Sequence, residues 1–240
     1  MRYLAIADDL RRQLASGELA AGRLLPSESE LGRAYAASRV TVRKALDVLR
    51  EEGLVDARQG FGWFVSAAPV EQTLGRLGTI EAQLAASGRA SQRQVLDFRF
   101  TAARARVRKV LGVDRVLEVR RVNLVDGVPF ARVTVWCPSD LARGLSLEDV
   151  EQATFHDLLG VELAGATQAI AAGAVSAADA EVLGVPEGSP ALLVERLTRS
   201  TSGASVLLSE HVFPGHLTRF VVELTSVDRS LAPSGLQLVR

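Results

Sequence analysis

The segment that decides the fold is residues 26–65, PSESELGRAYAASRVTVRKALDVLREEGLVDARQGFGWFV. A helical pattern over residues 28–35 leads through two alanines to Ser38, after which a second helical pattern begins. Two short strand-like segments then flank residues 59–62, whose two glycines permit a tight turn. We therefore expect two helices joined by a short turn and followed by a two-stranded ribbon.

The second helix of this segment has an apolar and a charged side. Its apolar positions are spaced i, i+3, i+4 and i+7, which predicts one buried stripe made of Val42, Ala45, Leu46 and Leu49. Ser38 can cap the helix, so its first turns present Arg39, Val40, Thr41 and Arg43 outward. By itself such a face is equally typical of a solvated helix. The preceding helix and the ribbon favour a winged helix-turn-helix, in which arginine reads guanine in the major groove.

The segment resembles the winged-helix domain of the GntR family of bacterial repressors. Four motifs carry the resemblance: SGELAAGRLLPSESEL, SRVTVRKAL, EEGLV and RQGFGWFV. Many members have arginine after PSE, where this chain has Ser29, so preference at the base that this arginine reads is open and Arg33 is a candidate substitute. From the resemblance and the helix start, the predicted DNA-binding residues are Ser38, Arg39, Thr41, Arg43, Lys44, Gly60 and Arg33.

Composition limits the alternatives. The chain has 240 residues, enough for one large or two small domains, and its 28 basic residues balance 28 acidic ones. DNA binding would then need local charge separation rather than bulk charge. The single cysteine, Cys137, excludes an intrachain disulfide and a zinc site of clustered cysteines. We find no apolar run of the roughly 20 residues that span a membrane and no signal peptide, so we expect a cytoplasmic protein.

The N-terminal helix and the domain boundaries follow from pattern. A helix over residues 3–16 is expected to turn Leu4, Ala7, Leu10 and Leu14 inward. We expect a DNA-binding domain over residues 1–66, a linker over 67–77, a second domain over 78–226 and a tail over 227–240. The second domain reads as α+β with an antiparallel sheet, and Asp126-Gly127 indicates a hairpin turn.

Residues 74–224 resemble the UTRA domain, the effector domain of the HutC branch of GntR regulators. The motifs are RRVNLVDGVPFARV, TFHDLL, VSAADAEVLGVPEGSPALLVERLT and FVVEL. The resemblance implies a chorismate lyase-like fold that binds a small-molecule effector without turning it over. It maps a strand arginine of the pocket to Arg120 or Arg121, and arginine suits phosphate or carboxylate. The predicted effector-binding residues are Thr79, Arg120, Arg121, Arg132, Thr154, Phe155 and Glu210.

No catalytic or metal-binding constellation is evident. The histidines His156, His211 and His216 lack a metal-ligand spacing, and we expect no cofactor. The sequence therefore predicts a ligand-responsive repressor that binds a palindromic operator as a homodimer. Two rivals remain: a chorismate lyase-like enzyme tethered to a DNA-binding domain, and a structural DNA-binding protein without an effector.

Overall fold

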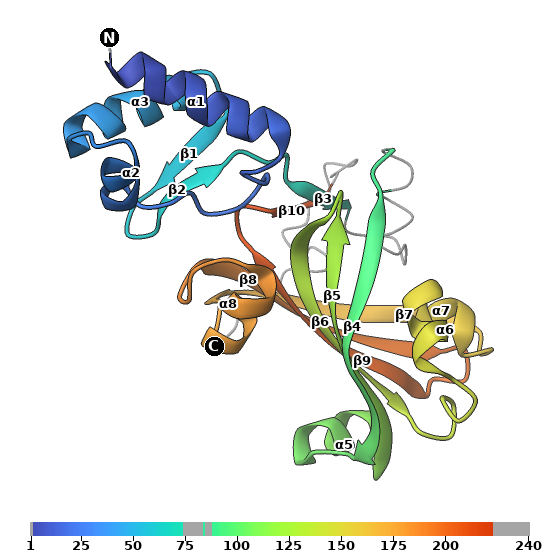
Figure 1. The fold of residues 1–240 in the computed structure, drawn as a ribbon. Helices are drawn as coiled ribbons and strands as arrows, with labels where there is room; N and C mark the ends of the chain where they lie inside the picture. The colour runs from blue at the N-terminus through green and yellow to red at the C-terminus, as the bar shows by residue number, and fades with distance from the viewer. Residues whose placement is uncertain (1, 74–83, 85–87, 223–240) are drawn as a thin grey trace, which may run out of the picture.

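The computed structural model describes residues 2–73, 84 and 88–222, which form two units joined by a short connection (Figure 1). Thr79 and the expected tail over residues 227–240 lie outside the described residues. The N-terminal unit contains three helices, α1 (Arg2–Ser16), α2 (Glu28–Ala34) and α3 (Arg39–Glu51). An antiparallel ribbon of β1 (Val55–Arg58) and β2 (Gly62–Val65) completes it. The order of elements is that of a winged helix-turn-helix.

Local capping explains where the two central helices begin. Ser27 and Glu30 form a reciprocal capping box at α2, and the Ser38 hydroxyl accepts a hydrogen bond from the Thr41 amide at 3.2 Å. The predicted stripe of α3 is confirmed, since its four residues are 0 % exposed. The expectation for Leu4 is wrong, because it is 40 % exposed while Ile6 is buried. The buried stripe of α1 is centred on Ile6, Ala7 and Leu10, and Leu4 lies on its flank.

The second unit is built on a six-stranded antiparallel sheet in the order β4-β5-β6-β9-β8-β7. The expected hairpin turn is confirmed, with positive φ angles of 51° at Asp126 and 78° at Gly127. The strands are β4 (Ser91–Ala102), β5 (Arg115–Val125), β6 (Val128–Pro138), β7 (Leu163–Ala174), β8 (Pro190–Ser200) and β9 (Ser205–Pro214).

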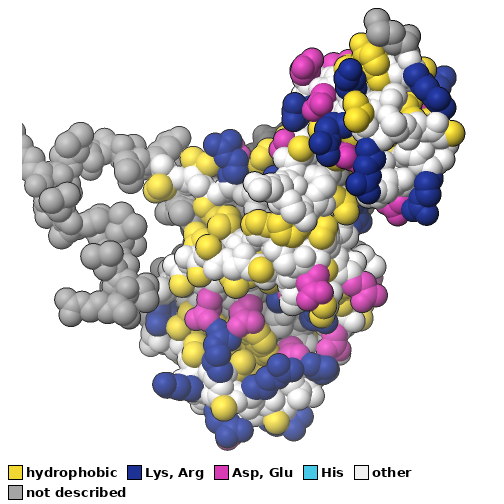
Figure 2. All heavy atoms as spheres, turned by 90° about the vertical axis from the view of Figure 1, so that its left-hand side faces the viewer, with side chains coloured by type: hydrophobic (Ala, Val, Ile, Leu, Met, Phe, Trp, Pro, Cys, Tyr) yellow, Lys and Arg dark blue, Asp and Glu magenta, His cyan; other side chains and the backbone are white. Residues whose placement is uncertain are grey.

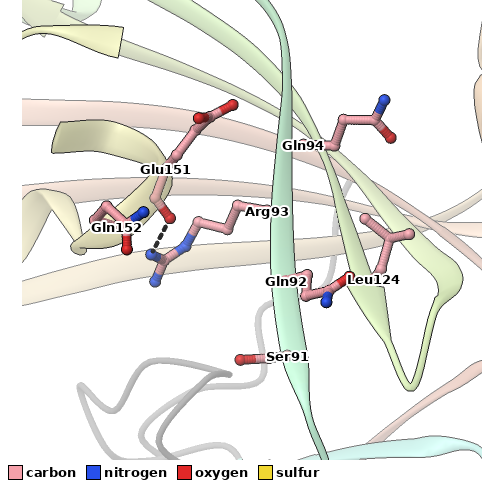
Figure 3. A pocket seen from close by; sticks show the side chains of 7 residues that line it. All are labelled: Ser91, Gln92, Arg93, Gln94, Leu124, Glu151 and Gln152. Carbon is pink, nitrogen blue, oxygen red and sulfur yellow. Dashed lines mark hydrogen bonds between the residues drawn. The ribbon is translucent and has the colours of Figure 1, made fainter. Parts of the chain in front are cut away.

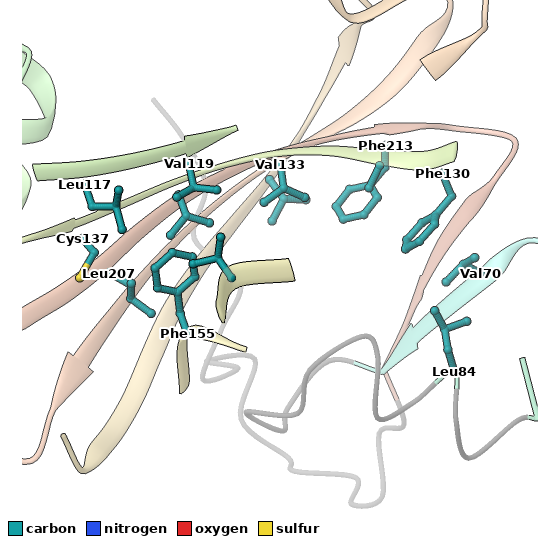
Figure 4. Packing of buried hydrophobic residues seen from close by; sticks show 14 of the residues in the cluster. Val70, Leu84, Leu117, Val119, Phe130, Val133, Cys137, Phe155, Leu207 and Phe213 are labelled. Carbon is teal, nitrogen blue, oxygen red and sulfur yellow. The ribbon is translucent and has the colours of Figure 1, made fainter. Parts of the chain in front are cut away.

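Helices cover the two faces of this sheet unequally. The inner face carries the largest hydrophobic cluster, in which Val119, Val133 and Phe213 pack with Phe155 (Figure 4). Phe155 begins α7 (Phe155–Leu158), which follows α6 (Leu147–Gln152) on this side. The outer face packs against α5 (Ala105–Leu111) and α8 (Ala177–Leu183) through two smaller clusters.

The expected linker contains a strand. Within residues 67–77, β3 (Val70–Thr73) pairs in parallel with β10 (Thr218–Val221), which follows β9. Val70 is 2 % exposed and joins the inner hydrophobic cluster. A four-residue strand whose partner lies far along the chain leaves little local pattern, so sequence alone indicated a loop. The connection between the two units is therefore hydrogen-bonded into the second one.

Candidate DNA interface and effector site

The N-terminal half of α3 presents a charged surface to solvent. Arg39, Arg43 and Lys44 are exposed, as are Ser38 and Val40. Figure 2 shows Lys and Arg side chains spread over the N-terminal unit, with fewer acidic ones among them. Because the chain is neutral overall, the grouping of Arg39, Arg43 and Lys44 at the start of α3 supplies the local charge separation that DNA binding requires.

The two arginines of this surface are held by α2. The Arg39 guanidinium donates to the Ser29 hydroxyl at 2.5 Å. Ser29, which stands where the resemblance predicts an arginine, therefore holds the Arg39 side chain in place. Arg43 donates to both carboxylate oxygens of Glu28, at 2.9 and 2.8 Å, and Trp63 of the wing donates to the same carboxylate at 3.2 Å. These bonds, led by that from Arg43, hold the pKa of Glu28 below its ordinary value.

The remaining predicted DNA-binding residues lie around this surface. Gly60 is at the exposed tip of the wing with φ 83°, a conformation that favours glycine. Arg33 is exposed near the end of α2. Thr41 is half-buried, and its hydroxyl lies 2.9 Å from that of Ser38. Thr41 therefore serves the helix cap in the free protein.

The structure divides the predicted effector-binding residues between the two faces of the sheet. Side chains alternate along a strand, so Arg120 and Arg121 of β5 point to opposite sides. Arg121 is in register with Val133 of the inner cluster and is 8 % exposed. Arg132 is in register with Val212 of an outer cluster. The residues on the outer face are Arg120, Arg132 and Glu210, so they cannot line one pocket with Arg121.

The outer-face arginines are engaged in an ion-pair network. Arg132 donates to both carboxylate oxygens of Asp179 in α8, at 2.7 and 3.2 Å, and Arg120 approaches the same carboxylate at 3.7 Å. Burial by itself would raise the pKa of Asp179, but the bond and charge of Arg132 outweigh it and leave this pKa below its ordinary value. Glu210 pairs with Arg106 of α5. These three predicted residues thus hold helices onto the outer face.

On the inner face, Arg121 shares its side of β5 with Asn123. Asn123 is 5 % exposed, and its Oδ1 accepts no hydrogen bond from the described residues. Arg93 of β4 is directly in register with Asn123. Thr154 caps α7 on this side through Asp157. Two-residue alternation from Arg121 is the signal that could have found Asn123, whereas Arg93 depends on strand register.

A hollow of about 630 Å³ opens beside these residues, between β4 and α6 (Figure 3). Arg93 reaches across it and donates to the backbone oxygen of Glu151 at 3.4 Å. None of the predicted effector-binding residues that the structure describes lines it. The lining residues are Ser91, Gln92, Arg93, Gln94, Leu124, Glu151 and Gln152.

His211 is half-buried on the same face, and its imidazole is neutral at physiological pH. Burial, assisted by the charges of Arg196 and Arg121, lowers the pKa of His211 to about 3. Its Nε2 lies 3.0 Å from the Ser209 hydroxyl, and its ring stacks on Phe213. Sequence reasoning had assigned no role to this histidine.

A small seam joins the two units. Arg23, in the connector before α2, donates to the Leu183 carbonyl at the end of α8 at 3.0 Å. The His216 ring packs on Phe64 of the wing, with centroids 4.8 Å apart, and its Nε2 lies 3.3 Å from the Gly22 carbonyl. The N-terminal unit therefore contacts the end of α8 and the turn that joins β9 to β10.

The described residues contain no group of three or more His, Cys, Asp or Glu side chains that could hold a metal ion. No helix among them is long and apolar enough to cross a membrane.

Comparison with known proteins agrees with both units. Residues 2–65 match the family of bacterial regulatory proteins named gntR, and residues 86–219 match the UTRA domain. The regulator Rv0792c of Mycobacterium tuberculosis is 34% identical over 98% of this chain and 88% of its own length. The repressor NagR of Bacillus subtilis is 29% identical over 91% of this chain and 93% of its own. The solved structure of PhnF from Mycobacterium smegmatis superposes with a TM-score of 0.62 at 24% identity, covering 92% of this chain and all of that one.

The class defined by the fold is a winged-helix regulator with an attached effector domain. The chain belongs to the GntR family and carries a UTRA domain, as in the HutC branch. Rv0792c and NagR are both transcriptional regulators, so the tethered-enzyme rival is not supported and the chain is a regulator rather than an enzyme.

Proposed function

We propose that this protein is an effector-controlled repressor that binds a palindromic operator as a homodimer in the cytoplasm. The carrying observation is the capped N-terminus of α3, which exposes Arg39, Arg43 and Lys44 together. In a helix-turn-helix dimer two such helices enter successive major grooves about one helical turn apart. Arg39 and Arg43 then contact bases or phosphates, while Lys44, Arg33 and the Gly60 wing tip contact the backbone.

Fluorescence anisotropy on DNA from the region upstream of the gene tests this interface. Arg39→Ala should weaken specific binding by about 5- to 150-fold per half-site, since a bidentate arginine–guanine pair contributes about 1–3 kcal/mol. The matched control is Arg143→Ala, because Arg143 is an exposed arginine of the second unit. Equal binding by both variants would contradict the interface. A complex of two chains per operator in analytical ultracentrifugation is the expected stoichiometry, and a one-to-one complex would contradict the homodimer.

Salt dependence separates Lys44 from the arginines. Lys44 has no ion-pair partner among the described residues and is proposed to contact only phosphate. Lys44→Ala should lower the slope of log K against log salt by about 0.9 per protomer, without changing preference among sequences. A changed sequence preference would instead assign Lys44 to base reading.

The effector is proposed to bind the inner face, beside Arg121, Asn123 and the start of α7. Two arginines, Arg93 and Arg121, lie on this face, and the buried Asn123 Oδ1 calls for a hydrogen-bond donor. This chemistry fits a small molecule that carries a carboxylate or phosphate next to a hydroxyl or amino group. Arg120, Arg132 and Glu210 take no part in this site.

Thermal shifts with sugar phosphates, amino-acid-derived carboxylates and neutral acyl compounds test the effector class. A ligand at 100 times its Kd adds about 2.7 kcal/mol to the free energy of unfolding, enough to raise Tm by several degrees. Asn123→Asp keeps the size of the side chain but adds a negative charge, and it should abolish the shift with anionic ligands. Arg143→Ala should keep it. A shift caused only by neutral compounds would contradict the anionic class.

A further inference from the structure

One apolar side chain stands out on the DNA-facing surface of α3. Val40 is 67 % exposed, the highest value among the large hydrophobic residues that the structure describes. It is the second residue of α3, one position after Arg39. Its neighbour Val42 is 0 % exposed and belongs to the core, so Val40 is the apolar residue that this helix start turns outward.

The polar groups around Val40 already have partners within the protein. Arg39 donates to Ser29, Thr41 serves the cap with Ser38, and Arg43 is paired with Glu28. The isopropyl group therefore projects from a turn whose polar side chains are held in place. Valine in a helix occupies essentially one χ1 rotamer, so presenting it costs little conformational entropy on binding.

We infer that Val40 reads thymine through an apolar contact with its C5-methyl group. This inference rests on the proposed DNA interface. Thymine is the one standard base that offers a methyl group in the major groove, and small apolar side chains are its usual contacts. Arg39 and Arg43 on either side would fix the position of α3 in the groove, so that Val40 meets one particular base pair in each half-site.

Methyl deletion in the operator tests the inference without changing the protein. Each thymine of a footprinted half-site is replaced by deoxyuracil, symmetrically in both half-sites. Burial of one methyl group is worth about a fourfold change in affinity per half-site. The wild-type protein should lose this factor at one thymine position and little elsewhere. At that position, replacement by 5-methylcytosine should be tolerated better than replacement by cytosine.

Protein variants complete the cycle. Val40→Ala should bind the thymine and deoxyuracil operators equally, because the methyl group no longer has a partner. The matched control is Leu4→Ala, which truncates an exposed leucine of α1 and should retain discrimination. Circular dichroism and Tm verify folding, and Val40→Ser, which also lacks the valine methyl groups, replaces the alanine variant should that be unstable.

The outcomes are distinguishable. If the wild-type protein binds its operator and needs Arg39, but no thymine position shows a methyl effect that Val40→Ala removes, this inference alone is overturned. If Arg39→Ala leaves specific binding intact, the proposed interface fails, and the inference fails with it. A methyl effect that persists in Val40→Ala assigns the contact to another residue and also overturns it.

Discussion

The helix proposed to contact DNA and the sheet face proposed to bind the effector differ in how much of each can be predicted from local sequence. In α3, one segment of 13 residues carries the cap, the buried stripe and the exposed arginines together. On the sheet, Arg120 and Arg121 are adjacent in sequence yet serve opposite faces, while Arg93 and Asn123 are far apart and lie side by side. A DNA interface made by one helix can therefore be located from local pattern, whereas a site made across strands depends on register.

The largest expected effect concerns the outer-face ion pair. Asp179→Ala leaves Arg132 buried without its counter-charge and should lower the free energy of unfolding by about 3–5 kcal/mol, measured by chemical denaturation. The double variant Arg132→Met with Asp179→Leu should recover most of this loss, since an apolar pair needs no charge compensation. If Asp179→Ala bound effector less tightly without losing stability, the division between faces would be wrong.

The same pair predicts a dependence on pH. The folded-state pKa of Asp179 lies below its ordinary value of 3.8, so its contribution is fully present above that value. It is lost as pH falls through the folded pKa, because the unfolded chain binds the proton first. The difference in stability between wild type and Asp179→Ala should therefore shrink in acid, and a constant difference would contradict the assignment.

A medium effect is expected at the seam between the units. Gly22 has φ 74°, and a Cβ added there would lie 2.8 Å from a Leu217 methyl group. Gly22→Ala should cost about 1–2 kcal/mol from backbone strain and should loosen the contact between connector and second unit. Gly17→Ala is the control, because Gly17 has φ 79° with nothing within 4 Å. Faster proteolysis in Gly22→Ala alone is the expected result. Equal rates in the two variants would show that the seam does not hold the connector against the second unit.

The smallest expected effects come from two helix caps. Ser38→Ala and Thr154→Ala each remove a side-chain acceptor from a helix start and should each cost about 1 kcal/mol of stability. The two variants should differ in which binding activity they weaken. Ser38→Ala should weaken DNA binding, and Thr154→Ala should weaken effector binding in the thermal shift. If either variant lowered only stability, that cap would be structural alone.

Sequence predicted elements with local signatures best. The cap at Ser38, the stripe of α3 and the Asp126-Gly127 hairpin are each specified within a few residues, and the structure contains all three. Prediction from sequence failed where a strand's pairing partner was distant in the chain or where the helical period did not settle burial. Leu4 lies on the flank of the apolar stripe of α1, so the helical period alone does not decide whether its side chain is buried. Strand β3 forms only by pairing with the distant β10. Helix α6 was not predicted, because Val150 is the one residue buried in it and leaves no periodic pattern.

The sequence by itself determined the class of protein and predicted the helix that we propose faces DNA, because capping, helical period and the resemblance to the GntR family all lie along continuous segments. Tertiary structure decided which arginine of each strand faces the inner cluster and which partners hold the others. It also decided that Ser29 supports Arg39 and that the connection between units is a strand. The physical reason is that strand register and helix packing bring together groups whose spacing along the chain carries no trace of their contact.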